Sequence, residues 1–459
     1  MKSTLSKTNP SSSEAGMWPL FIVSLPLMLS SLSGSLMLLC DRLFLARYSL
    51  GSFNSIVTIS SVIVMLQIGA NVCASIADVF VGQLNGADKK LSLSAPTWQM
   101  IWFSLSTSFL FLPLAFFLSA FYPESLRNHP DEIFYFKLLV AICPLSPLHV
   151  ALSSFFIGRK QTAIPMVSAL IGNGVNLVLN YLLIFGHEQL GILELGVKGA
   201  AIATATAQCV SLGILILVFF SKSNRSEYRT YDAKFDGPLL LKILKVGYPN
   251  VIAQVMIAGA WSCFFVLMNK LGEASITMAS MMQTLTGFFV FVVQGLSRGI
   301  ISVSANLIGS RKTTLIARVL FSGMQLSILF SLVILVSFLA YPSGIMKLFF
   351  SSNDYEKAYS YFRTLKLALF WGWLAFLFKS IRSLLSGLLT SSGKTQFVMW
   401  NETISIWLCF IMPIWLCIQF LPFDVSWAYF IAFLYNFVAV IIYYLKFFKM
   451  DWEREGQVI

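Results

Sequence analysis

Residues 17–40 read MWPLFIVSLPLMLSSLSGSLMLLC and contain no charged side chain. An α-helix of about 20 apolar residues suffices to cross the hydrocarbon core of a bilayer. The run is longer than the apolar part of a secretory signal peptide, and it shows no A-x-A cleavage pattern. We therefore expect a retained first membrane helix behind a polar tail at 1–16.

Similar apolar windows recur along the whole chain, in which 57% of the residues are hydrophobic and only 11% are charged. This composition argues against a soluble protein of the same size. The predicted fold class is an all-α membrane protein with about 12 transmembrane helices in two pseudo-symmetric six-helix lobes, embedded in a lipid bilayer. The expected spans lie near 17–45, 53–81, 98–121, 133–157, 162–186, 198–220, 243–269, 275–308, 316–341, 360–390, 395–420 and 426–448.

The net charge of +12 does not require a nucleic-acid partner, because Lys and Arg stand in short clusters between the apolar windows. With the amino terminus inside, the inner loops hold Lys89, Lys90, Arg159, Lys160, Lys222, Arg225, Arg229, Lys234, Lys242, Lys245, Arg311, Lys312, Lys394, Lys446 and Lys449. The outer loops hold fewer, such as Arg47, Arg127, Lys198, Lys270 and Lys347. This bias predicts a multi-pass protein of the bacterial inner (plasma) membrane with both termini cytoplasmic.

A weak internal repeat divides the chain. The stretch Gln67-Ile-Gly69, followed by Gly82 to Lys90, recurs as Gln294-Gly295, followed by Gly309 to Lys312. Likewise, Gly158-Arg-Lys-Gln-Thr162 recurs as Gly393-Lys-Thr-Gln396. Parallel halves of this kind are typical of alternating-access carriers. The expected organisation is a lobe at 17–220, a cytoplasmic linker and hinge at 221–240, a lobe at 241–448 and a cytoplasmic tail at 449–459.

The sequence predicts no cofactor, metal site or catalytic centre. Its seven cysteines stand singly, without a CxxC pair or a Cys/His cluster. Its histidines, His129, His149 and His187, are far apart in the predicted topology, and no Gly-rich phosphate loop, HExxH or GxSxG occurs. These features disfavour an enzyme and an ATP-driven pump.

Asp41 is the main candidate for ion coupling, because a charge at membrane depth is costly and usually functional. It stands fifteen positions after Pro26, which removes a backbone hydrogen bond and permits a helix bend. A carboxylate that gains and loses a proton would bias this bend. The alternative is that Asp41 only pairs with the adjacent Arg42 at the outer surface.

Asn176 and Asn180 lie four residues apart and therefore share one face of the fifth expected helix. Thr204 and Gln208 repeat this spacing on the sixth, within a run of small residues. With Asp41, these side chains would surround a proton or a sodium ion with oxygens. The alternative is that they hydrogen-bond and pack neighbouring helices together.

The second half carries the opposite charge at membrane depth. Lys379 and Arg382 lie three residues apart, and Glu402 follows on the next expected helix. We predict either a Lys379–Glu402 pair or a contact with an anionic part of the substrate, with snorkelling to the surface as the alternative. The cavity candidates are Gln67, Asn71, Gln208, Gln283, Gln294, Arg298, Lys379, Arg382 and Glu402.

The chain resembles the multidrug and toxic compound extrusion (MATE) family, in particular its NorM-like branch, within the wider multidrug/oligosaccharidyl-lipid/polysaccharide exporter superfamily. The resemblance covers nearly the whole chain, and the order and spacing of its pieces make it specific. These pieces are Leu25-Pro26 with Asp41, Val81-Gly82-Gln83 with Asn85-Gly86, Asn176-x3-Asn180-Tyr181 with Phe185-Gly186, Gly199-Ala200-Ala201 with Ala203-Thr204, and Gly247-Tyr248-Pro249.

The resemblance implies a secondary antiporter that exports organic, often cationic and amphipathic, compounds in exchange for H+ or Na+. It implies that Asp41 is the central coupling group, and that Asn176, Asn180 and Thr204 line the same cavity. Ile257 and Lys379 depart from the family, which usually has Glu and Asp at these positions. We therefore expect coupling through the first half alone, with H+ favoured over Na+.

The expected function is the export of a small organic substrate by a monomer that uses no cofactor besides its coupling ion. One alternative is a lipid-linked saccharide flippase of the same superfamily, which Arg298, Lys379 and Arg382 would suit. An alternative from another class is a membrane enzyme or receptor that transports nothing.

Overall fold

The computed structural model describes residues 15–117, 130–340 and 362–459. Most of the expected tail at 1–16, and the residues Arg127, His129 and Lys347, lie outside these ranges. Within them, 12 helices are long and apolar enough to cross a membrane, which confirms the predicted all-α membrane fold. The described residues contain no β-contact besides one isolated bridge between His187 and Ile192.

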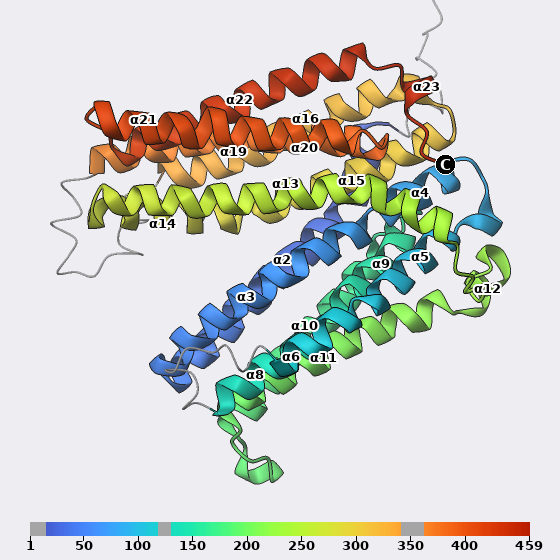
Figure 1. The fold of residues 1–459 in the computed structure, drawn as a ribbon, viewed down its shortest axis with the longest axis horizontal. Helices are drawn as coiled ribbons and strands as arrows, with labels where there is room; N and C mark the ends of the chain where they lie inside the picture. The colour runs from blue at the N-terminus through green and yellow to red at the C-terminus, as the bar shows by residue number, and fades with distance from the viewer. Residues whose placement is uncertain (1–14, 118–129, 341–361) are drawn as a thin grey trace, which may run out of the picture. The chain divides into compact units, whose positions relative to one another are not determined.

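Figure 1 shows the helices of the first half. Their bounds are α2 Met17–Tyr48, α3 Leu50–Ser75, α4 Ala77–Gly86, α5 Ala95–Ser106, α6 Ser108–Phe117, α8 Pro130–Ala141, α9 Leu145–Gly158, α10 Ala163–Phe185, α11 Gly196–Phe219 and α12 Lys222–Tyr228. Several spans combine two of these elements, such as α3 with α4 and α8 with α9.

The helices of the second half are α13 Gly237–Lys270, α14 Glu273–Phe288, α15 Val290–Gly309, α16 Ile316–Ala340, α19 Phe362–Ser391, α20 Thr395–Ile406, α21 Met412–Phe420, α22 Val425–Lys449 and α23 Trp452–Glu455. The eighth window, expected near 275–308, is divided at Phe289 into α14 and α15. Only Val290–Gly309 has the length and hydropathy of a span. Gly287, a poor helix former, lies just before the break.

Contacts group the chain into two compact units whose boundaries lie inside helices. The N-unit consists of Leu29–Val251 with Val458–Ile459, and the C-unit consists of the described residues up to Met28 with Ile252–Gln457. The beginning of α2 is therefore part of the C-unit: in α15, a Cβ on Gly299 would lie 2.0 Å from Oγ of Ser24. Pro26 lies inside α2, two residues before its boundary.

Four matching turns give the sequence repeat a structural basis. Each turn has one residue with positive φ: Asp88 at 55°, Lys160 at 61°, Arg311 at 58° and Gly393 at 75°. In each, the next residue donates its backbone N–H to the carbonyl five positions earlier: Lys89 to Leu84, Gln161 to Phe156, Lys312 to Leu307 and Lys394 to Leu389. This hydrogen bond is the helix-ending Schellman motif, so both halves end corresponding helices in the same way.

Part of the linker and hinge expected at 221–240 contacts other elements of the N-unit. Lys90 Nζ lies 2.9 Å from Glu227 Oε1, and Arg159 donates to Asn224 at 3.2 Å. On α5, Gln99 donates to the Lys234 carbonyl at 2.9 Å. Residues 221–236 are therefore an ordered part of this unit, because both ion pairing and backbone hydrogen bonds fix them.

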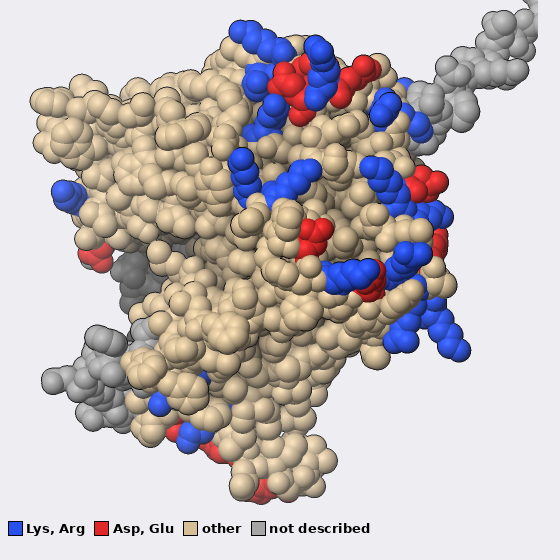
Figure 2. Space-filling model, turned by 45° about the vertical axis from the view of Figure 1, so that its right-hand side comes forward, with Lys and Arg blue, Asp and Glu red and all other residues tan. Residues whose placement is uncertain are grey.

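Each unit has its own apolar core. In the C-unit one cluster surrounds Phe264 and Phe410 and another surrounds Leu384 and Tyr443. In the N-unit a cluster forms around Phe136 and Ile184. Figure 2 shows that the surface along the helices carries almost no charged side chains, whereas Lys and Arg gather near helix ends. This distribution is the one that a bilayer requires.

Candidate functional site: a polar chain around Asp41

The site in the N-unit depends on a close approach of α10 and α11. A Cβ on Gly199 would lie 2.4 Å from the carbonyl oxygen of Leu183, and one on Gly172 would lie 2.8 Å from Cβ of Ser211. Only glycine fits at these positions. The small residues of α11 therefore let the two backbones meet, and this contact brings the polar faces of the helices together.

A chain of hydrogen bonds connects the four residues that the sequence singled out for ion coupling. Asn180 Nδ2 donates to Asp41 Oδ1 and, at 2.9 Å, to Asn176 Oδ1. Asn176 Nδ2 donates in turn to Thr204 Oγ1 at 3.4 Å. Asn176 and Asn180 are buried, with 1% and 0% of their surface exposed. The i, i+4 spacing on α10 thus positions two amides so that one of them serves the carboxylate.

Asp41 is half-buried in α2, and its surroundings differ from those of its neighbour Arg42, which is exposed. The helix continues to Tyr48, which places Asp41 about 10 Å from the end of the helix at 1.5 Å per residue. In the part of the chain that the structure describes, the hydrogen bond to Asp41 comes from Asn180 and no ion pair to Arg42 is formed.

Asp41 lines a cavity of about 220 Å³. Two further cavity candidates, Gln67 and Gln208, and Thr204 of the polar chain also line it. Sequence reasoning missed Tyr135 of α8, whose hydroxyl lies 3.3 Å from Ser60 Oγ in the same wall. The complete lining is Gly34, Met37, Leu38, Asp41, Ser60, Ile63, Val64, Gln67, Tyr135, Leu139, Thr204 and Gln208.

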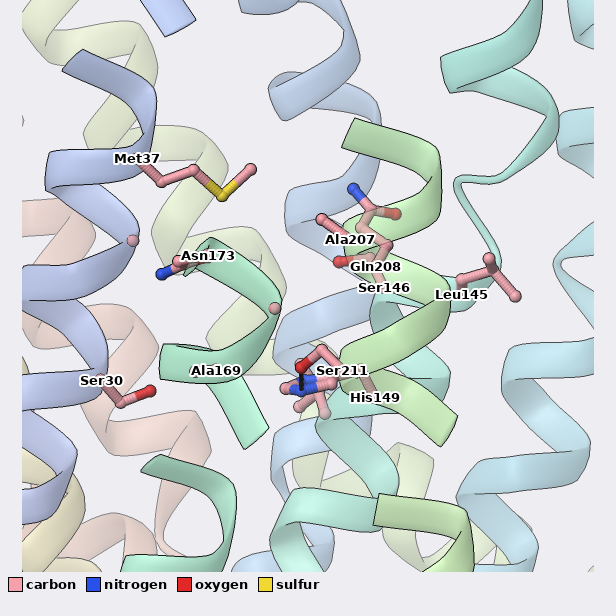
Figure 3. Close-up of a pocket in the computed structure, with 13 residues that line it drawn as sticks. Ser30, Met37, Leu145, Ser146, His149, Ala169, Asn173, Ala207, Gln208 and Ser211 are labelled. Atoms are coloured by element: carbon pink, nitrogen blue, oxygen red, sulfur yellow. Dashed lines mark hydrogen bonds between the residues drawn. The ribbon is translucent and has the colours of Figure 1, made fainter. Parts of the chain in front are cut away.

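A second cavity of about 200 Å³ adjoins the first and shares Gly34, Met37 and Gln208 with it. Figure 3 shows side chains from α2, α9, α10 and α11 around this space, with Gln208 and His149 on its wall. His149 Nε2 lies 3.0 Å from Ser211 Oγ. No sequence pattern indicates His149, because a single histidine in an apolar run has no distinguishing spacing.

The remaining candidates of the N-unit are dispersed along α3. Gln67 donates its side-chain amide to Cys143 Sγ at 3.3 Å. Asn71 lies one turn further along, and its Oδ1 is buried without a hydrogen-bond partner among the described residues. Neither residue joins the hydrogen-bond chain around Asp41.

Two charged candidates of the C-unit, Arg382 and Glu402, form a separate cluster between α19, α20 and α22. Arg382 Nη1 lies 3.3 Å from Glu402 Oε2 and donates to the hydroxyl of Tyr435 at 2.8 Å. The hydroxyl of Tyr443 donates to Glu402 Oε1 at 3.0 Å. Both charged side chains are buried, at 7% and 8% exposure, so this cluster is a neutralised, hydrogen-bonded ion pair.

This geometry corrects the expected Lys379–Glu402 pair. Glu402 pairs with Arg382 instead, one turn along α19 from half-buried Lys379. The two basic residues are three positions apart and nearly share a helix face, so their spacing could not decide which one would meet Glu402. Gln283 and Gln294 are exposed, on α14 and α15, and Arg298 is half-buried. None of these three belongs to the ion-pair cluster.

Comparison with known proteins connects this arrangement to a family. The sequence model of the MatE family matches residues 26–182 and 249–416. A probable multidrug resistance protein NorM from Thermotoga maritima is 23% identical over 391 residues, covering 84% of this chain and 82% of that protein. A probable multidrug resistance protein YoeA from Bacillus subtilis is 22% identical over 402 residues, with the same coverage of 84% and 82%.

Solved structures show the same fold over almost the full length. A transporter of the MOP superfamily from Pyrococcus furiosus superposes with a TM-score of 0.81 at 16% identity, covering 98% of this chain and 100% of that one. A mutant of the Vibrio cholerae MATE transporter VcmN gives a TM-score of 0.80 at 18% identity, covering 97% and 100%.

Proposed function

We propose a function from the premise that this chain belongs to the MatE family of multi-pass membrane transporters: it exports small organic compounds, amphipathic or cationic, in exchange for H+. The relatives described above carry names that refer to multidrug resistance. The observation that supports the proposal is the single carboxylate of Asp41, half-buried in a cavity wall and hydrogen-bonded to a buried amide.

The donors around Asp41 favour H+ over Na+ as the coupling ion. A sodium site needs several oxygens that converge on the ion. Here Asn180 directs its N–H groups, not its oxygen, at Asp41 and Asn176. An amide that donates to a carboxylate stabilises its charged form. Protonation of the carboxylate would weaken this hydrogen bond. Asp41, Asn176, Asn180 and Thr204 are therefore the proposed coupling residues.

Transport follows from competition between a proton and a cation for the same carboxylate. With Asp41 charged, the cavity attracts an organic cation; with Asp41 neutral, this attraction is lost. Protonation of Asp41 then weakens cation binding, and cation binding weakens protonation of Asp41 by the same free energy. The proposed cycle takes substrate from the cytoplasm and releases it outside when Asp41 is protonated, with α2 rearranging near Pro26 as the carboxyl changes its partners.

The two six-helix lobes, 17–220 and 241–448, would provide alternating access in a monomer with both termini in the cytoplasm. The rival function of a lipid-linked saccharide flippase depended on a cationic cavity in the second half. Glu402 neutralises the charge of Arg382. Of the three basic residues, only Arg298 and Lys379 would then supply positive charge to such a cavity. Drug-like substrates remain the better-supported proposal.

Ethidium uptake into everted vesicles, whose cytoplasmic face is outside, tests the proposal. An imposed proton gradient should drive ethidium transport by the wild type with and without Na+, and Asp41→Asn should abolish it while the protein still inserts into the membrane. Arg42→Gln, which removes the neighbouring exposed charge, should transport normally. Undiminished transport by Asp41→Asn would show that Asp41 has no part in the mechanism. Transport that requires Na+ would show that Na+, and not H+, is the coupling ion.

A further inference from the structure

His149 belongs to a short chain of hydrogen bonds in the wall of the second cavity. His149 Nε2 lies 3.0 Å from Ser211 Oγ, and Ser211 Oγ lies 2.8 Å from Ser168 Oγ. Ser168 Oγ also lies 2.7 Å from the carbonyl oxygen of Ser211. Figure 3 shows His149 and Ser211 facing each other beneath Gln208, from α9 and α11.

This chain accommodates both charge states of the imidazole. A protonated ring donates from Nε2 to Ser211 Oγ, after which Ser211 donates to Ser168 and Ser168 donates to the Ser211 carbonyl. A neutral ring with a bare Nε2 accepts from Ser211, which accepts from Ser168. Every hydroxyl proton has a partner in both arrangements. The two hydroxyls of this chain can therefore follow the uptake of a proton at His149 Nε2 without losing a hydrogen-bond partner.

Few ionisable groups compete with His149 in this part of the N-unit. The helices packed against α9 are α3, α4, α5, α10 and α11, and their charged side chains are Asp78 on α4 and Lys198 on α11. Neither of these charged side chains lines the two cavities described above, and the thiols of Cys73 and Cys209 do not line them either. Along the two adjoining cavities, the ionisable lining residues that the structure describes are His149, Asp41 and Tyr135.

Each of the two cavities alone is smaller than a typical pocket for an organic ligand, which favours a substrate that contacts both His149 and Asp41. Pockets for organic ligands typically measure about 300–1,000 Å³, whereas these cavities measure about 200 and 220 Å³. An organic substrate would therefore extend through both, past the shared residues Gly34, Met37 and Gln208. It would meet the carboxylate at one end and the imidazole at the other.

We propose that His149 is a second proton-binding residue of the transporter and that it determines specificity for organic cations. This inference rests on the proposed function and deepens it. With Asp41 charged and His149 neutral, the joined cavities carry one negative charge and accept an organic cation. With both groups protonated they carry one positive charge and repel it. An imidazole is the side chain that most often gains or loses a proton near neutral pH.

Ethidium binding to the purified protein, measured by fluorescence anisotropy from pH 5.0 to 8.5, tests the proposal. The slope with which log Kd rises as pH falls equals the number of protons displaced by the ligand. We expect a slope of about 2 at the acidic end for the wild type and about 1 for His149→Gln, which keeps a hydrogen-bonding group but cannot become charged. His187→Gln, in the loop after α10, is the matched control and should keep the wild-type slope.

A second variant keeps the test valid if His149→Gln is poorly folded. Ser211→Ala removes the hydroxyl next to the ring and should change the pH at which binding weakens. A wild-type slope in folded His149→Gln, or a wild-type pH midpoint in Ser211→Ala, would overturn the role of His149, while a reduced slope in Asp41→Asn would leave the proposed function intact. Wild-type protein that does not bind ethidium, or binds it equally at every pH, would overturn the proposed function and this inference with it.

Discussion

Asn180 of α10 donates its side-chain amide to the carboxylate of Asp41 on α2, and it does so from a position with no solvent exposure. The same amide nitrogen also donates to Asn176 at 2.9 Å. Asn180 therefore couples the state of the carboxylate to the packing of α10 against α11. A change of charge at Asp41 cannot leave this amide undisturbed, because its donor would lose a charged acceptor.

Asn180→Ala should weaken both the fold and the coupling. Removing one partner of buried hydrogen bonds costs about 1–3 kcal/mol, so we expect a fall of this size in the free energy of unfolding in detergent. Proton-driven ethidium efflux should fall more than tenfold, since Asp41 loses its donor. Tyr181→Phe, at the exposed neighbouring position, is the control and should leave both measurements near wild type. Normal efflux by Asn180→Ala would show that Asp41 works alone.

The buried pair of Arg382 and Glu402 predicts a different pattern of stability. Removing one partner of a buried ion pair leaves a charge uncompensated and costs about 3–5 kcal/mol. Arg382→Met should therefore be strongly destabilised, whereas the double variant Arg382→Met, Glu402→Leu should regain most of the lost stability. Denaturant unfolding in micelles would measure both. Lys379→Met is the control, and a loss as large as that of Arg382→Met would contradict the assigned pairing.

The sequence predicted the spans well because each one needs only a sufficient length of apolar residues. The exception, the division at Phe289, depends on local backbone geometry that hydropathy does not report. The contacts made by the linker and hinge expected at 221–240 could likewise not be predicted from the sequence. Polar composition indicated a surface segment. Gln99, on a helix far away in the sequence, donates to the Lys234 carbonyl and accepts from the backbone N–H of Asp236, and these contacts hold the segment.

The candidate site shows the same division between local and tertiary information. Asn176 and Asn180 could be placed together because a helix repeats every 3.6 residues. Their contact with Asp41 depends on how α2 packs, and the choice of Arg382 over Lys379 by Glu402 depends on how α19 packs against α20. His149 belongs to no sequence pattern that would have indicated its position in a site. Its neighbour Ser211 lies 62 positions away, so only the folded chain brings the two together.

The ion pair between Lys394 and Glu455 predicts how the short helix α23 responds to pH. Nζ of Lys394 lies 2.8 Å from Oε2 of Glu455, and this hydrogen bond lowers the pKa of Glu455. A lowered folded-state pKa gives a contribution that is complete above the unfolded-state value of about 4.3 and is lost as pH falls through the folded-state value. The docking of α23 should therefore be constant from pH 8 to 5 and weaken only in stronger acid.

A fluorophore attached at Glu453→Cys would report this docking through its anisotropy. Glu453 is exposed and lies within α23, so the label should follow the mobility of the helix. Adding Glu455→Gln should lower the anisotropy between pH 8 and 5, to the value that the ion pair's loss gives in strong acid, and remove its dependence on acid. An anisotropy that changes between pH 8 and 5, or that is insensitive to Glu455→Gln, would show that the ion pair does not hold α23.

Two glycines of α11 test whether the close approach to α10 builds the site. A Cβ on Gly199 would lie 2.4 Å from the carbonyl oxygen of Leu183, whereas one on Gly213 has no atom within 4 Å. Gly199→Ala should cost about 1–3 kcal/mol by overpacking and reduce efflux, because separating the helices draws Thr204 away from Asn176. Gly213→Ala should be neutral or stabilising, since alanine is favoured over glycine in a helix by about 0.5–1 kcal/mol. Equal stability and efflux in the two variants would mean that the polar chain around Asp41 does not depend on this contact.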